Sequence, residues 1–266
     1  MMTKFLTTAS LSLLALGTLA AQQSDAKATK LLGDVEAALG GWDMLYAKGD
    51  VEYHYDYRYP GNGQADVSTE RYIFEGEHSY GHYTQHDINV VPGASAKTVT
   101  QTYVDRQPGA MMDGEKATDE AAVGGAAFLR PTNYYWFTMF YKLNDPGSVA
   151  KYEGRETVDG TAYEKVHVSY DPAVTGKELN DEYILYIHPK TKRVDMFYFS
   201  LPVMGVTAPV ILMKNNYETV DGVPVVTRRD IYQPQEDGTY PDAPQLVQTL
   251  TNVKFGNGFT KADLRG

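Results

Sequence analysis

The chain has 266 residues, with 34 acidic and 24 basic side chains and no cysteine. Without cysteine it can form neither disulfides nor a thioether-linked lipid anchor, and its net charge of −10 argues against binding nucleic acid or anionic head groups. This length suits one large all-β domain or two small ones.

The first residues are typical of a cleavable export signal. Lys4 supplies a short positive segment, Phe5 to Leu19 form an apolar segment, and Thr18 and Ala20 are small residues of the kind that signal peptidase reads. The apolar segment is shorter than the ~20 residues of a membrane span. We therefore expect a signal peptide at residues 1–20 and an exported chain that carries no lipid anchor.

The remaining residues, 21–266, contain no linker or low-complexity segment and are expected to form a single domain. Their most apolar segment, Leu201–Met213, is too short for a membrane helix and contains Pro202 and Pro209. We therefore expect no transmembrane segment after the signal peptide.

A helical repeat follows the signal peptide. Ser24 or Asp25 can cap a helix, and Gly40-Gly41 would end it. The apolar stripe of this helix consists of Leu31, Leu32, Val35, Ala38, Leu39 and Trp42. The pattern predicts one amphipathic helix.

From Asp50 onward the apolar period changes to two, which indicates β-strands. The first strand places five residues on one face, namely Val51, Tyr53, Tyr55, Tyr57 and Tyr59. Hairpins follow with turns near residues 76–81, at Asp159-Gly160, at residues 189–192 and at Asp221-Gly222, and further strands end at Pro108-Gly109 and within residues 245–257. We expect about ten strands in an antiparallel sheet.

Two short helices are expected between residues 116 and 142. The first would cover Asp119–Ala122 and end before Gly124-Gly125. The second would begin after Pro131, capped by Thr132 or Asn133, and would contain an aromatic run. With the first helix, they would cover part of one face of the sheet. The fold class expected from these patterns is mainly β, of the α+β type.

The aromatic run, YYWFTMFY at residues 134–141, is the strongest functional signal. Trp136, Met139 and Phe140 fall on one helical face. We expect them, with Tyr135, Phe197 and Phe199, to line an apolar cavity that binds a hydrophobic ligand. The alternative is that the run only packs the core.

Signatures of catalysis are absent from the sequence, which contains no nucleophile elbow, zinc-protease motif or nucleotide loop. His78, His82 and His86 lie in one predicted hairpin, where Glu75 or Glu77 could add a metal ligand. We expect these histidines to face solvent, and we assign no catalytic residue, metal or cofactor. A secreted hydrolase or metal-dependent enzyme that uses this hairpin is the alternative.

Four segments resemble the LolA/LolB-like superfamily of outer-membrane lipoprotein-sorting proteins. They are LLGDVEAALGGWDML leading into DVEYHYDYRY, the hairpin RETVDGTAYEKVHVSY, and DEYILYIHPKTKRVDMFYFS. The segment RPTNYYWFTMFYKLNDPG is similar to one in uncharacterised secreted families that are grouped with this superfamily.

The resemblance implies a curved antiparallel sheet that forms an incomplete β-barrel, with an N-terminal helix and short helices over its concave face. It also implies a periplasmic protein whose hollow holds a lipid, a lipoprotein acyl chain or another hydrophobic ligand. An envelope protein partner is a further expectation. A module that only assembles with such a partner is the third interpretation.

Overall fold

The computed structural model describes residues 24–90 and 98–265. The predicted signal peptide at residues 1–20 therefore lies outside the described residues. Within the described ranges, no helix has both the length and the apolar character that crossing a membrane requires.

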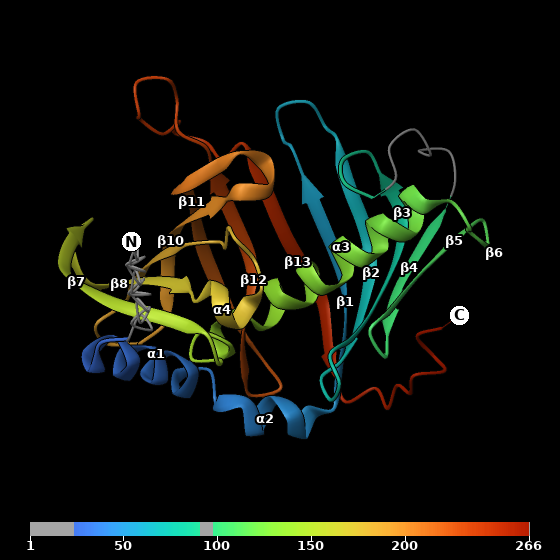
Figure 1. The fold of residues 1–266 in the computed structure, drawn as a ribbon, viewed down its shortest axis with the longest axis horizontal. Coiled ribbons are helices and arrows are strands. Elements are labelled where there is room, and N and C mark those ends of the chain that lie inside the picture. The colour runs from blue at the N-terminus through green and yellow to red at the C-terminus, as the bar shows by residue number, and fades with distance from the viewer. Residues whose placement is uncertain (1–23, 91–97, 266) are drawn as a thin grey trace, which may run out of the picture.

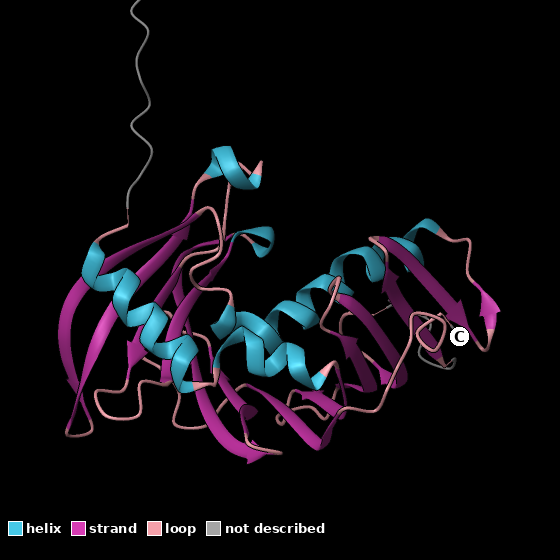
Figure 2. Ribbon diagram, turned by 90° about the horizontal axis from the view of Figure 1, so that it is seen from below, coloured by secondary structure: helices cyan, strands magenta, loops and turns pink. Residues whose placement is uncertain are grey.

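The thirteen strands of the described residues form one antiparallel sheet that is curved and does not close (Figures 1 and 2). From one edge to the other they are β6 (Glu115–Lys116), β5 (Gln107–Met112), β4 (Val99–Val104), β3 (His78–His86), β2 (Ala65–Ile73), β1 (Asp50–Arg58), β13 (Leu246–Phe255), β12 (Val223–Tyr232), β11 (Val206–Val220), β10 (Val194–Leu201), β9 (Tyr183–Ile187), β8 (Thr161–Tyr170) and β7 (Ser148–Val158). The first and last strands in the chain, β1 and β13, pair at the centre of the sheet.

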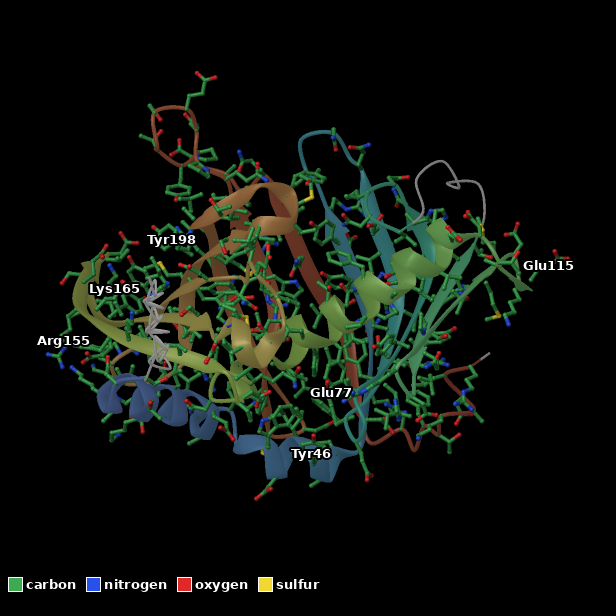
Figure 3. All side chains as sticks on the ribbon, viewed as in Figure 1. Tyr46, Glu77, Glu115, Arg155, Lys165 and Tyr198 are labelled. Atoms are coloured by element: carbon green, nitrogen blue, oxygen red, sulfur yellow. The ribbon has the colours of Figure 1, made fainter. Side chains whose placement is uncertain are left out.

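A long helix joins the two edges of the sheet. The helices are α1 (Ala26–Ala38), α2 (Gly41–Lys48), α3 (Glu120–Thr138) and α4 (Pro172–Thr175), with 3-10 helices η1 (Met139–Tyr141) and η2 (Pro202–Met204). Because α3 and η1 connect β6 to β7, which lie at opposite edges, α3 must cross the concave side of the sheet (Figure 1). Figure 2 shows α3 inside the curve, with α1 and α2 beside it. Figure 3 labels Glu115 on β6 and Arg155 on β7 at opposite ends of the molecule.

The main core lies between the helices and the concave face of the sheet. Leu32 and Val35 of α1 are fully buried against it, and Asp25 caps α1 as predicted by accepting a hydrogen bond from the Ala28 backbone N–H. On β1, Val51, Tyr53 and Tyr55 are buried on the predicted face. The incomplete barrel with helices on its concave face is confirmed.

The helical region before β7 differs from the prediction, because α3 runs without a break from Glu120 through Pro131. A proline in a helix interior costs about 3 kcal/mol. Contacts on either side of it hold the helix in place, since Arg130 forms a buried ion pair with the sheet and the Tyr134 hydroxyl donates to the Phe74 carbonyl. Tertiary packing therefore overrides the local signal of the proline.

Gly40 and Gly41 end the first helix, but they do not end the helical region as predicted. Gly40, at φ 96°, ends α1 in a left-handed conformation that favours glycine, but α2 begins directly after it. The prediction of a single helix was therefore wrong. Trp42 belongs to α2 and packs near Tyr141 of η1, with ring centroids 5.4 Å apart.

The hairpin turns at Asp159-Gly160 and Asp221-Gly222 are confirmed, with both residues of each pair at positive φ. Pro108-Gly109 does not end a strand but lies within β5, and the turn before it uses Asp105-Arg106 at φ 53° and 61°. The apolar segment Leu201–Met213 forms the end of β10, the 3-10 helix η2 and the first part of β11.

Candidate ligand-binding site

Aromatic side chains from α3, η1 and β10 meet on the concave side of the sheet. Ring centroids of Trp136 and Phe199 lie 5.5 Å apart in an edge-to-face arrangement, and Trp136 and Phe197 lie 6.2 Å apart. Phe140 meets Phe197 edge-to-face at 6.0 Å. Such separations are the favourable range for aromatic pairs. Residues that are distant in the sequence thus pack against one another here.

The other two predicted residues lie in the same layer. Met139 is almost fully buried in the main core, and both it and Phe140 belong to η1 rather than to α3, which ends at Thr138. Tyr135 is partly buried, and its hydroxyl lies 2.7 Å from that of Tyr170. Burial holds the pKa of Tyr135 well above its usual value, so its phenol stays neutral.

A small cavity lies beside this cluster, between the helical layer and β12. It has a volume of about 20 Å³, which suits about one water molecule. Of the predicted site residues, Phe140 lines it, with Leu39 and Leu45 from the α1–α2 region and Arg229 from β12. That the six predicted residues line a larger ligand cavity remains a prediction.

Arg229 is a candidate residue that the sequence prediction missed. Its side chain is only 4% exposed, and its Nη2 donates to the backbone carbonyl of Trp136 at 2.7 Å. Burial lowers the pKa of its guanidinium. A signal was present in the sequence, because Arg229 falls at the same strand parity as the buried Ile231, two residues further along β12.

A second buried arginine, Arg130 of α3, binds Glu70 of β2 with two hydrogen bonds, of 2.5 and 3.1 Å. Both side chains are fully buried, and Arg130 also donates to the hydroxyl of Tyr83. Gly81 makes room for this contact, since a Cβ atom at that position would lie 2.3 Å from Arg130 Nη1. This pair anchors the middle of α3 to the sheet.

The three histidines of β3 are not all exposed, and the expectation that they face solvent was wrong for His78 and His86, which are each 3% exposed. The Nδ1 atom of His82 lies 2.9 Å from the Thr100 hydroxyl, and His78 Nε2 lies 3.8 Å from Asp105. No group of three or more metal-binding side chains of the His, Cys, Asp or Glu type occurs in the described parts of the chain. A metal-dependent enzyme that uses these histidines therefore lacks a set of metal ligands in the described residues.

A curved, unclosed antiparallel sheet with helices across its concave face is the incomplete β-barrel of LolA-like proteins. Solved structures with this fold cover nearly the whole chain. A DUF1329 family protein from Desulfovibrio piger has a TM-score of 0.54 at 12% identity, covering 90% of this chain and 96% of its own. A LolA superfamily protein from Nitrosomonas europaea has a TM-score of 0.51 at 12% identity, covering 89% and 96%.

A putative outer membrane lipoprotein-sorting protein domain from Vibrio parahaemolyticus has a TM-score of 0.51 at 8% identity, covering 90% of this chain and 96% of its own. Residues 127–221, which include the aromatic run and β10, match a family of unknown function, DUF6503. No curated protein sequence matches the chain. The structural neighbours thus confirm the resemblance at the level of the fold.

Proposed function

We propose that this chain is an exported, periplasmic binding protein that holds a lipid, a lipoprotein acyl chain or another hydrophobic ligand. The ligand lies between the α3–η1 segment and the concave face of the sheet at β10. The observation that carries this proposal is the aromatic cluster of Trp136, Phe140, Phe197 and Phe199 on the inner side of an unclosed barrel.

The physical basis is the apolar character of this layer. Transfer of an acyl chain from water to an apolar site gains about 0.8 kcal/mol per CH₂ group, so a chain of ordinary length binds without many polar contacts. Trp136 is only partly buried although it packs on Phe197 and Phe199. Trp136 therefore keeps exposed surface that a ligand can cover. The lipoprotein-sorting description of the Vibrio protein supports the same class of ligand.

Mass spectrometry of the protein purified from its own envelope tests export and binding together. Under denaturing conditions we expect the mass of a chain that begins at Ala21, because a signal peptidase would remove residues 1–20. Under native conditions we expect an additional mass that organic extraction identifies as a lipid. An intact Met1 on soluble protein would contradict export, and a bare native mass would count against a tightly held ligand.

A further inference from the structure

The two buried arginines of this chain differ in their partners. Arg130 has a complete ion pair with Glu70. Arg229 is also buried, at 4% exposure, but among the described residues its one hydrogen bond goes to the neutral carbonyl of Trp136 and no carboxylate forms an ion pair with it. Removing a charge from water without a counter-charge is strongly unfavourable. The site of Arg229 therefore has an excess positive charge.

The neighbours of Arg229 on the sheet do not supply the missing charge. Asn215 on β11 and Gln248 on β13 are its direct partners across the strands. Both are neutral amides, and the side-chain oxygen of each is buried without a hydrogen-bond partner among the described residues. Asn215, Arg229 and Gln248 thus form a polar row across three strands, and this row contains no anion.

The carbonyl of Trp136 belongs to the last turn of α3, where the helix dipole places a partial negative charge. This carbonyl accepts a hydrogen bond from one of the five N–H groups of the guanidinium. Arg229 also lines the 20 Å³ cavity, together with Phe137 and Phe140. Its side chain therefore faces a space whose other lining residues are aliphatic or aromatic and carry no charge.

We propose that Arg229 binds the carboxylate of the ligand, which makes the ligand a long-chain carboxylic acid. The acid group pairs with Arg229 in the cavity, and the chain extends along the aromatic cluster of Trp136, Phe140 and Phe197. A planar carboxylate matches the fork of the guanidinium with two parallel hydrogen bonds, and the 20 Å³ space beside Arg229 must widen to admit it. This inference rests on the proposed function and adds the chemistry of the head group to it.

The test compares a long-chain fatty acid with its methyl ester, each displacing a neutral fluorescent probe at about pH 8, where the acid is ionised. The wild-type protein is expected to bind the acid roughly 10- to 100-fold more tightly than the ester, the range for hydrogen bonds to a charged group. Arg229→Met removes this preference, because it weakens binding of the acid far more than binding of the ester. Arg229→Lys keeps the charge and retains part of the preference.

Arg228→Met is the matched control, since Arg228 is the next residue on β12 but is exposed and pairs with Asp230. It should keep the full preference for the acid. Equal binding of acid and ester by the wild-type protein would overturn the inference and leave the proposed function standing. Equal weakening of both ligands in Arg229→Met would also overturn it, because it would assign Arg229 to holding α3. Binding of neither ligand by the wild-type protein would overturn the proposed function as well.

Discussion

Replacing Arg130 with methionine is expected to lower the free energy of unfolding by about 3–5 kcal/mol. The substitution leaves the carboxylate of Glu70 fully buried without its counter-charge. Ser68 and Tyr72 still donate hydrogen bonds to that carboxylate, but neither carries a charge. Urea denaturation followed by circular dichroism measures the loss.

Two control variants make this result specific. Arg155→Met breaks an ion pair with Glu164 in which the arginine side chain is 66% exposed, and such surface pairs contribute at most about 1 kcal/mol. Replacing both Arg130 and Glu70 with methionine should recover much of the stability, since no uncompensated charge remains. A loss below about 1 kcal/mol for Arg130→Met alone would show that the pair does not hold α3 against the sheet.

Phe197→Ala is expected to cost about 3–5 kcal/mol of stability, because truncating a buried phenylalanine leaves a cavity that the surroundings fill only in part. Phe197 is fully buried and meets four aromatic rings, those of Trp136, Phe140, Tyr183 and Phe199. Thermal or urea unfolding of the variant measures this cost.

Trp136→Ala should cost less than Phe197→Ala, since Trp136 is only partly buried in the same cluster. This order separates the two interpretations of the aromatic run. If Trp136 only packs the core, its truncation should cost as much as that of Phe197, and the ligand-site interpretation would lose its main support.

The sequence predicts the fold well where local chemistry decides. Asp159-Gly160 and Asp221-Gly222 tolerate the positive φ angles of tight turns, and the alternation of Val51 to Tyr59 correctly shows which face of β1 is buried. Thirteen strands were found where about ten were expected, mainly because short edge strands such as β6 have little pattern of their own.

Long-range contacts decide the features that were missed. Pro131 indicates a helix start when read locally, but the Arg130–Glu70 pair 60 residues apart keeps α3 continuous. At the candidate site, local and long-range information contribute differently. Apolar patterning and the resemblance to a known fold already suggest that Trp136 lies near Phe197 and Phe199. The isolation of Arg229 from acidic side chains depends on the pairing of β11, β12 and β13, which no local pattern reveals.

Titration with a fluorescent fatty acid tests the central claim, that the α3–η1 layer and β10 form a site for a hydrophobic ligand. We predict saturable binding by the wild-type protein and clearly weaker binding by Trp136→Ala. The control variant is Tyr198→Ala, which should bind as the wild-type protein does. Tyr198 (labelled in Figure 3) lies on β10 but on the face opposite to Phe197 and Phe199. Binding that is absent from the wild-type protein, or that Trp136→Ala leaves unchanged, would contradict the account.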